Sequence, residues 1–338
     1  MAKKFRVVQV GMCHEHADGK ILTLKEFKNE FEIVGIVDDR SSKTPRRERT
    51  DNYAPFDGVP RITEEAALSD PTVEGILIEP TNEDLVPFAR RAVERGFNIH
   101  MDKPTGQKLE PFIDLVEYCR AKNIYMQLGY MFQGNPAVKF IQNFVCNGGI
   151  GDVISAEADM NHCYGDEQYN EYLSTFQGGI IYNLGCHLLD AIMPMMPGLP
   201  NRTHQIFLEG PGELKGCANT AVSILEWPHA TVTLHASSHA KGSHFVRRLR
   251  VIGTKGWVEV CPIERFDGKP LVVEMYISEA SGGYPAGRNR IEFAPQYNRY
   301  IEQLREFVKI VRGEIPNPNN YDHDIMVHKA VRMASGLK

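Results

Sequence analysis

The sequence lacks the features that mark several classes of protein. It has no apolar run long enough to span a bilayer, and no apolar signal segment with a cleavage site follows Met1. The net charge of -5 at pH 7 leaves no basic surface for nucleic acid or anionic lipid. We therefore expect a cytoplasmic protein that binds neither nucleic acid nor membranes.

The cysteines also form no recognisable framework. They are seven, an odd number, and no two have the Cys-x-x-Cys spacing. Scattered cysteines of this kind are typical of reduced, packed thiols and not of a disulfide framework or a zinc knuckle. The seven are Cys13, Cys119, Cys146, Cys163, Cys186, Cys217 and Cys261.

The length of 338 residues exceeds the usual size of one hydrophobic core and favours two domains. Strands alternate with helices over residues 5–130, which predicts a doubly wound parallel sheet. Successive strands over residues 205–277 predict a mainly antiparallel sheet. We expect an α/β domain over residues 1–124 and an α+β domain over residues 125–338.

A short apolar run follows Gly96 and ends in Asp102-Lys103-Pro104. Its length, its large apolar residues and the helical patterns on both sides predict a buried parallel strand. Because ligands bind beyond the carboxyl ends of the strands in open α/β sheets, Lys103 is a candidate to hold a substrate oxygen. The alternative is a solvated lysine in an ordinary strand-to-helix turn.

The turn after the first strand is the candidate site for a dinucleotide. Gly11 fits the glycine fingerprint of such turns, but Cys13 and His16 stand at the second and third glycine positions. Asp38 ends the second strand, where an acidic side chain binds the adenosine ribose and favours NAD. Arg40 is close enough to leave NADP open.

His14 and His16 of the same turn also suggest a metal. Their two-residue spacing can converge in a turn, but no helical spacing of ligands supports a metal site. Histidines that donate to a phosphate or cap the following helix are favoured, and we assign no metal from the sequence.

A second constellation lies in Gly178–Asp190. If this segment is helical, Asn183, His187 and Asp190 share one face because they are four and three residues apart. Histidine is the side chain best suited to proton exchange near neutral pH. A purely structural histidine is the alternative for His187.

Four stretches together resemble the glucose–fructose oxidoreductase / inositol dehydrogenase (Gfo/Idh/MocA) family. They are the turn after the first strand, Asp102-Lys103-Pro104, the Gly-Gly…Asn-x-Gly-x-His-x-x-Asp segment and Val251–Val260. The resemblance implies an N-terminal Rossmann domain and a C-terminal domain whose open sheet commonly makes dimer or tetramer contacts. It also implies NAD(P)-linked oxidation or reduction of sugars, polyols or their derivatives.

The resemblance assigns roles to particular residues. Lys103 matches the family's catalytic lysine, although the motif is more often Glu-Lys-Pro, and His187 matches its catalytic histidine. Asn183 stands where many members have an aspartate, so it can hydrogen-bond a hydroxyl but cannot accept a proton as a carboxylate does. Thr81 and Asn82 match the loop that lies against the cofactor.

These observations predict hydride transfer between a carbinol of a carbohydrate-like substrate and nicotinamide, with Lys103 polarising the oxygen and His187 taking the proton. A non-redox enzyme of the same fold, with bound NAD or a metal, and a catalytically silent binding protein are the alternatives. The expected cofactor contacts are Gly11, Cys13, His14, His16, Asp38, Arg40, Pro80, Thr81, Asn82, Asp102 and Lys103. The expected substrate contacts are Tyr130, Asn161, His162, Tyr164, Asn183 and His187.

Overall fold

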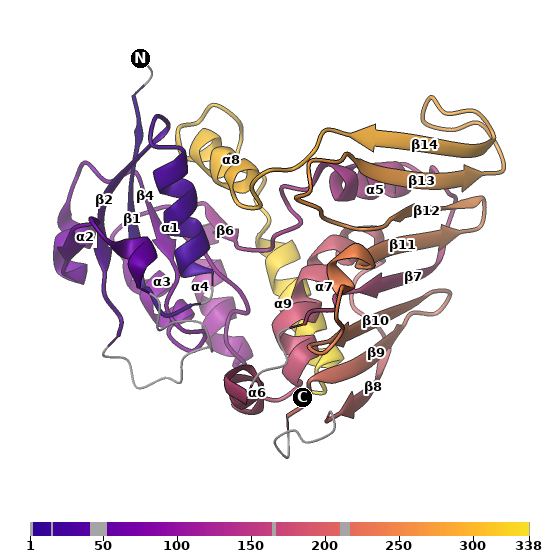
Figure 1. Cartoon of the computed structure of the whole chain (residues 1–338), viewed down its shortest axis with the longest axis horizontal. Helices are drawn as coiled ribbons and strands as arrows, with labels where there is room; N and C mark the ends of the chain where they lie inside the picture. Colours follow the sequence, from indigo (N-terminus) through magenta and orange to yellow (C-terminus); the bar gives the residue numbers. More distant parts are fainter. Residues whose placement is uncertain (1–2, 15, 41–52, 164–166, 210–216, 338) are drawn as a thin grey trace. The chain divides into compact units, whose positions relative to one another are not determined.

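A computed structural model describes residues 3–14, 16–40, 53–163, 167–209 and 217–337. The chain forms two compact units, and each unit includes one segment from the C-terminal part of the chain. The first unit is Met1–Tyr130 with Tyr300–Ile325, and the second is Met131–Arg299 with Met326–Lys338. Each unit is built around one sheet (Figure 1).

The first unit has a six-stranded sheet in the order β3-β2-β1-β4-β5-β6, and every pair of neighbours is parallel. This is the order of a doubly wound sheet and confirms the predicted α/β fold. The strands are β1 (Phe5–Val10), β2 (Phe31–Val37), β3 (Arg61–Ile62), β4 (Gly75–Ile78), β5 (Ile99–Met101) and β6 (Met126–Leu128). The helices are α1 (Ala17–Glu26), α2 (Glu64–Ser69), α3 (Leu85–Glu94), α4 (Leu109–Lys122) and α8 (Ile301–Val311), with a 3-10 turn, η1, at Ala54–Phe56.

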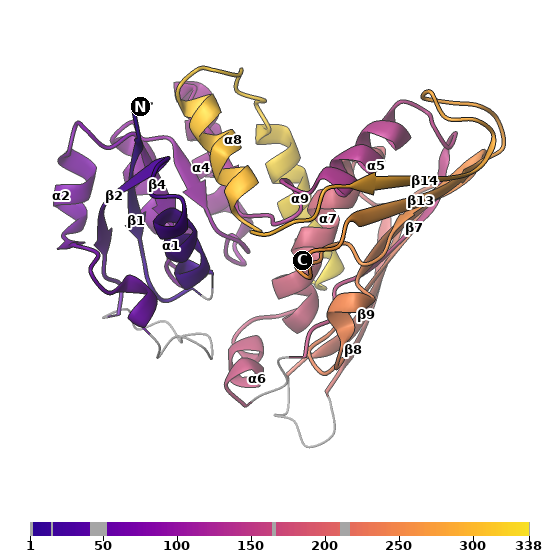
Figure 2. The same cartoon turned by 45° about the horizontal axis from the view of Figure 1, so that its top comes forward.

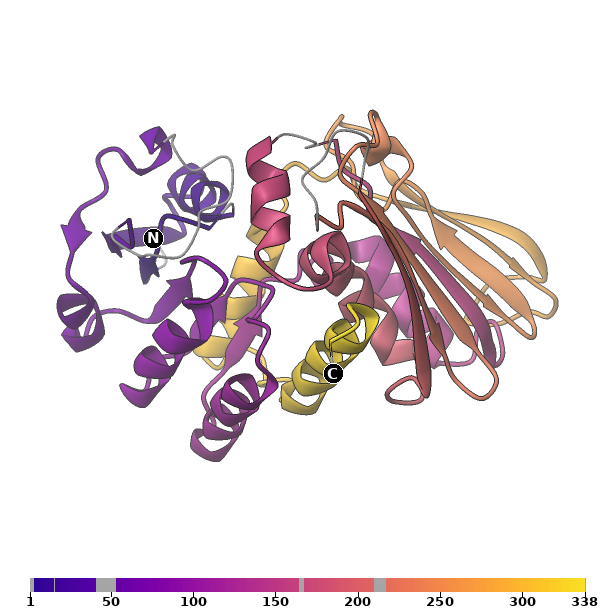
Figure 3. The same ribbon diagram turned by 90° about the horizontal axis from the view of Figure 1, so that it is seen from below.

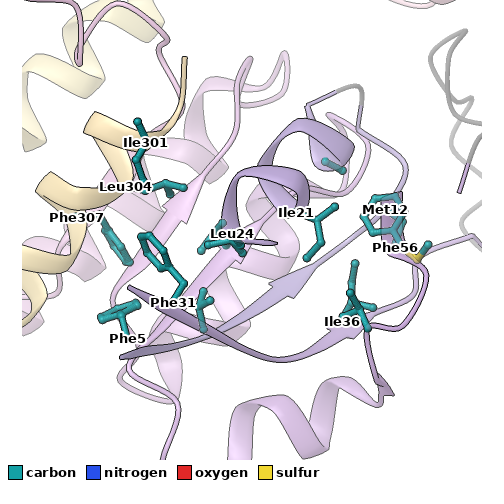
Figure 4. Packing of buried hydrophobic residues seen from close by; sticks show 14 of the residues in the cluster. Phe5, Met12, Ile21, Leu24, Phe31, Ile36, Phe56, Ile301, Leu304 and Phe307 are labelled. Carbon is teal, nitrogen blue, oxygen red and sulfur yellow. The ribbon is translucent and has the colours of Figure 1, made fainter. Parts of the chain in front are cut away.

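Helices α1 and α8 contribute to one hydrophobic cluster on this sheet (Figure 4). On α1, Ile21 and Leu24 share the buried face, as residues three apart on a helix do. On α8, Phe307 lies with its ring centroid 5.9 Å from that of Phe5 and 5.8 Å from that of Tyr125. Helix α8 has one apolar, buried face, and its packing assigns it to the first unit.

The second unit has an eight-stranded sheet in the order β14-β13-β12-β11-β7-β10-β9-β8. Only the β7–β10 pair is parallel among its named neighbours, so the predicted mainly antiparallel sheet is confirmed. Its strands are β7 (Val153–Asp159), β8 (Arg202–Leu208), β9 (Thr220–Glu226), β10 (Thr231–Ser237), β11 (Arg248–Gly253), β12 (Gly256–Val260), β13 (Leu271–Ile277) and β14 (Gly287–Phe293).

Helices α5 (Pro136–Cys146) and α7 (Cys186–Ile192) lie on one face of this sheet (Figures 2 and 3). The remaining helices are α6 (Glu167–Ser174) and α9 (Tyr321–Ala334), which runs from the first unit into the second, and a short 3-10 turn, η4, at Ser243–Phe245. No helix in the described part of the chain is both long and apolar enough to cross a membrane.

The segment that contains Asn183, His187 and Asp190 is helical and has three parts. A π-helical turn, η2 (Ile181–Gly185), leads into α7, and a 3-10 turn, η3 (Met193–Met195), ends it. A π turn inserts an extra residue into the helical repeat and often marks a functional site. Asn183 lies in the π turn and His187 in α7, so the simple three-and-four spacing does not describe their faces.

Candidate functional site

The functional residues of the first unit meet at the carboxyl edge of its sheet. Val10 of β1 pairs with Ile78 of β4, and Ile78 pairs with Met101 of β5. The next residue of each strand is therefore at the same level, which aligns Gly11, Glu79 and Asp102. The strand order reverses between β1 and β4, and this reversal is where open α/β sheets bind their ligands.

The turn after β1 depends on its glycine. Gly11 has a φ of 98°, and a Cβ atom built on it would lie 2.3 Å from the backbone nitrogen of Pro80. No larger residue fits between β1 and the loop after β4 without moving backbone. The turn is also held from the other side, because the amide of Met12 donates to Asp39 Oδ1 at 2.7 Å.

The two histidines of the turn bind the loops after β4 and β5. His14 Nε2 lies 2.9 Å from Asn82 Oδ1 and 3.1 Å from the carbonyl oxygen of Lys103. His16 Nδ1 lies 3.0 Å from Asp102 Oδ2. His16 is the N-cap residue of α1, but its side chain makes no capping hydrogen bond.

Lys103 is fully buried, with 0% relative exposure, so it is not the solvated turn lysine that the sequence left open. Its backbone is held on both sides of the residue. The amide of Lys103 donates to Asp102 Oδ1 at 2.7 Å, and its carbonyl receives the His14 contact. The residue that carries the proposed chemistry therefore has a fixed backbone.

Four polar residues that the sequence did not single out are buried beside these side chains: Lys20, Glu79, His100 and Gln127. Lys20 Nζ lies 3.5 Å from Glu79 Oε1 and donates to His100 Nε2. His100 Nδ1 lies 2.8 Å from Gln127 Oε1. The signal was available, because Lys20 falls on the apolar stripe of α1 formed by Ala17, Ile21 and Leu24.

The pKa values of two buried carboxyl groups, those of Asp102 and Glu79, are shifted in opposite directions. Burial alone would raise the pKa of Asp102, but His16, His14 and Lys20 hold that pKa well below its usual value. Burial raises the pKa of Glu79 well above its usual value, and the negative charge of Asp102 raises it further. Asp102 is therefore biased toward the anionic form and Glu79 toward the neutral form, an arrangement used to divide acid and base roles.

The histidines of this cluster are biased toward the neutral form. Burial lowers the pKa of His100 to about 3, and the adjacent Lys20 charge acts in the same direction. Neutral His100 then donates from Nδ1 to Gln127 and accepts from Lys20 at Nε2. Burial also lowers the pKa of His16, although Asp102 opposes the shift.

Asp38 and Arg40 lie at the end of β2. Arg40 Nε lies 2.9 Å from Asp38 Oδ1 and 2.8 Å from Oδ2. The hydrogen bonds from Arg40 lower the pKa of Asp38, so this carboxylate is ionised at neutral pH. The other expected cofactor residues of this unit, Cys13, Pro80, Thr81 and Asn82, are buried, and Thr81 Oγ1 donates to Asp84 Oδ2 at 3.0 Å.

The second unit holds its own polar cluster. His187 is fully buried, and its Nδ1 accepts a hydrogen bond from the amide of Met131 at 3.2 Å. Asn183 Nδ2 donates to Tyr169 Oη at 2.9 Å, and Gln133 Nε2 donates to Asp190 Oδ1 at 3.0 Å. The segment that begins at Met131 therefore orients the polar residues of α7, and Tyr169 of α6 orients Asn183 of η2.

The remaining substrate candidates are supported by a residue that sequence reasoning missed. The guanidinium of Arg247 contacts His162 Nδ1, donates to the carbonyl of Asn161 at 2.7 Å and pairs with Glu264 at 2.7 Å. Arg247 and Glu264 are both buried. Tyr130 is buried in the first unit, and Tyr164 lies outside the described residues.

The three expected catalytic residues, Lys103, His187 and Asn183, are thus each buried and held within one of the two units. Lys103 belongs to the first unit with the expected cofactor residues, and His187 belongs to the second with Asn183, Asn161 and His162.

A doubly wound domain followed by an α+β domain with a large sheet also occurs in solved structures named as oxidoreductases and dehydrogenases. The UDP-N-acetylglucosamine 3-dehydrogenase of Acidithiobacillus ferrooxidans is similar with a TM-score of 0.76 at 13% identity, over 99% of this chain and 98% of that one. The aldose-aldose oxidoreductase of Caulobacter crescentus is similar with a TM-score of 0.75 at 19% identity, over 99% and 98% of the chains. At these identities the similarity is one of fold.

Residues 138–259 match the family model for the GFO/IDH/MocA C-terminal domain. Together with the fold, this match confirms the resemblance to the Gfo/Idh/MocA family.

Two relatives are similar in sequence. An uncharacterized oxidoreductase of Rhizobium meliloti is 24% identical over 139 residues, which cover 41% of this chain and 42% of that protein. A D-xylose 1-dehydrogenase (NADP(+)) of Haloferax volcanii is 21% identical over 257 residues, 75% of this chain and 74% of that one. The match thus spans less than half the length of the first relative and about three quarters of the second.

Proposed function

We propose that the chain is an NAD(P)-dependent oxidoreductase that transfers a hydride between nicotinamide and a secondary alcohol or ketone carbon of a sugar, polyol or glycoside. The observation that carries this proposal is that Gly11 and Asp102-Lys103 follow β1 and β5, the two neighbours of β4, at the carboxyl edge of the sheet beside the reversal of the strand order. The names of two similar proteins, a dehydrogenase of xylose and a dehydrogenase of a nucleotide sugar, support a carbohydrate as the substrate.

The first unit has the groups that a dinucleotide needs. Gly11 leaves no side chain between the turn and the loop after β4, and helix α1 begins close by, so the positive end of its dipole lies near the turn. The ionised carboxylate of Asp38 can accept hydrogen bonds from the adenosine ribose and repels a 2′-phosphate, which favours NAD over NADP. The nicotinamide of a bound NAD supplies the hydride acceptor.

Lys103 is proposed to hold the reacting oxygen of the substrate. An ammonium group on a fixed backbone stabilises negative charge on that oxygen without reorganising during the reaction. Asn183 is proposed to bind a neighbouring hydroxyl, because its amide can donate and accept hydrogen bonds but does not titrate.

His187 is proposed to exchange the hydroxyl proton. Because its Nδ1 accepts the Met131 amide, the neutral ring carries its proton on Nε2 and donates from that atom. Uptake of a proton onto the ring requires the Met131 amide to lose its acceptor. Proton transfer therefore involves a shift of the ring or of this segment, and the resting state of His187 is a hydrogen-bond donor.

The large sheet is the proposed contact surface of a homodimer or homotetramer. On its edge strand β8, Ile206 is 58% exposed and Leu208 55% exposed, which is unusual for two apolar residues on one strand face. Light scattering after size-exclusion chromatography measures the mass in solution, and a monomer at all concentrations would contradict this part of the proposal.

The proposed activity is tested in two steps. Calorimetric titration with NAD and NADP measures cofactor binding, and a panel of sugars, polyols and glycosides is then screened by the absorbance of reduced cofactor. Net reduction with at least one substrate supports the dehydrogenase. Product without net reduced cofactor favours a non-redox enzyme of this fold, and binding without any product favours a silent binding protein.

A further inference from the structure

Three side chains from two distant segments converge at the carboxyl edge of the first sheet. They are His14 and His16 of the turn after β1 and Asp102 after β5, and one ligand atom of each lies within 4.8 Å of the others. All three residues are buried. We propose that His14, His16 and Asp102 bind a divalent first-row transition-metal ion.

The distances suit a common coordination sphere. Asp102 Oδ2 lies 3.0 Å from His16 Nδ1 and 3.6 Å from His14 Nδ1. Ligand atoms at 2.0–2.1 Å from a tetrahedral Zn²⁺ are roughly 3.4 Å apart. Two imidazoles and one carboxylate are a ligand set used by zinc and by non-haem iron sites. The His-x-His spacing in the sequence offers only two ligands, and the structure adds Asp102 as the third.

The outer contacts are those of a metal-binding histidine. Such a histidine donates its second ring N–H to a carbonyl or carboxylate, which fixes the tautomer that binds the metal. His14 Nε2 has two acceptors of this kind, Asn82 Oδ1 at 2.9 Å and the carbonyl of Lys103 at 3.1 Å. The donating proton is thus on Nε2, and Nδ1 carries the lone pair that faces Asp102.

The carboxylate ligand is also held by an outer contact. Asp102 Oδ1 accepts the Lys103 amide at 2.7 Å, which holds the carboxylate at the end of a rigid strand. In the metal-free arrangement, the amide of His16 donates to His14 Nδ1 at 3.2 Å, the long end of the hydrogen-bond range. Metal binding replaces this weak contact.

Three protein ligands leave further coordination positions open. Catalytic metal sites have this form, with water or a substrate oxygen in the open position. The occupant of these positions at this edge of the sheet is an oxygen ligand such as water, a hydroxyl group or a phosphate oxygen. This inference does not depend on the proposed dehydrogenase activity, because it concerns the ligand set alone.

The test uses the untagged full chain, treated with a chelator and then transferred to chelator-free buffer. Calorimetric titration with Zn²⁺ and with Mn²⁺ measures stoichiometry, and added Co²⁺ is followed by its visible absorption. We expect one ion per chain. Asp102→Asn and His14→Ala should abolish binding, and Asn82→Ala should weaken it about 10–100-fold through the lost outer contact.

His229→Ala is the matched control, since it removes an exposed histidine and should leave binding unchanged. Circular dichroism establishes that each variant is folded. If Asp102→Asn does not fold, the Co²⁺ spectrum of the unaltered protein and the Asn82→Ala variant decide the question. Absence of stoichiometric binding and of a Co²⁺ band in the unaltered protein overturns the proposal, as does unchanged affinity in His14→Ala and Asn82→Ala.

Discussion

His16 Nδ1 lies 3.0 Å from Asp102 Oδ2, although the two residues are 86 positions apart in the sequence. The contact joins the turn where a glycine fingerprint is expected to the strand end that carries Lys103. A histidine at the position of the third glycine thus contacts a buried carboxylate and not solvent. His16, which departs from the glycine fingerprint, thus contacts the residue directly before the candidate catalytic Lys103.

Replacing Lys103 tests the catalytic assignment. Lys103→Met keeps a long apolar stem but removes the charge that would stabilise the substrate oxygen. We expect kcat to fall by about 10²–10³-fold, with NAD affinity nearly unchanged. Steady-state kinetics and calorimetry measure the two effects. Lys108→Met, which removes an exposed lysine five residues away, is the control, and full activity of Lys103→Met contradicts the assignment.

Replacing Asp38 tests cofactor choice. Its ionised carboxylate repels a 2′-phosphate, so Asp38→Ser should raise NADP affinity relative to NAD by about tenfold or more. Competitive titration with both dinucleotides gives the ratio. An unchanged ratio would mean that Asp38 does not lie at the ribose, and tighter NAD binding in the variant would contradict its assigned role.

The turn after β1 should not tolerate a side chain at Gly11. Gly11→Ala combines a positive φ with a Cβ atom 2.3 Å from Pro80 N, so backbone must shift. We expect a loss of more than about 1 kcal/mol of stability and weaker dinucleotide binding. Gly58→Ala is the matched control, because Gly58 has a φ of 75° but no atom within 4 Å of the added methyl. Equal effects of the two changes would exclude a role for close packing.

The buried polar cluster should be important for stability. Lys20→Met removes the positive charge beside Glu79 and the donor to His100 while keeping the volume of the side chain. Lys20 also compensates the charge of the buried Asp102, and removing one partner of a buried ion pair costs about 3–5 kcal/mol. Urea unfolding followed by circular dichroism measures the loss. Lys28→Met changes an exposed lysine two residues after the end of α1 and should cost little. A similar midpoint for both variants contradicts the importance of the cluster.

The cysteines should divide into two classes of reactivity. Cys146, Cys163 and Cys261 are exposed, whereas Cys13, Cys119, Cys186 and Cys217 are buried. Burial raises the pKa of Cys119 to about 12, so its thiolate is absent at neutral pH. A chromogenic disulfide reagent should therefore modify three thiols in the native protein and all seven after denaturation. Fast modification of Cys119 in the folded protein is the contrary result.

Much of the fold could be predicted because it depends on local periodicity. The strand and helix repeats of the first part of the chain predict a parallel sheet, and the strand runs after residue 200 predict an antiparallel one. The helix near residue 300 is equally visible as an apolar stripe. Its packing against Phe5 and Tyr125 is not, since a stripe specifies that a helix is buried but not which sheet buries it.

The candidate site, like the fold, could be predicted from the sequence only in part. By itself the sequence determined which chemical groups are available: a glycine at a strand end, an acidic residue after the next strand, a lysine before a proline and a histidine in an apolar helix. Only the tertiary structure decided that His14, His16 and Asp102 converge, and that Lys20, Glu79 and His100 are buried together. The physical reason is that parallel strands bring residues some 90 positions apart to one sheet edge, where burial changes their charge and hydrogen bonding beyond what residue type alone indicates.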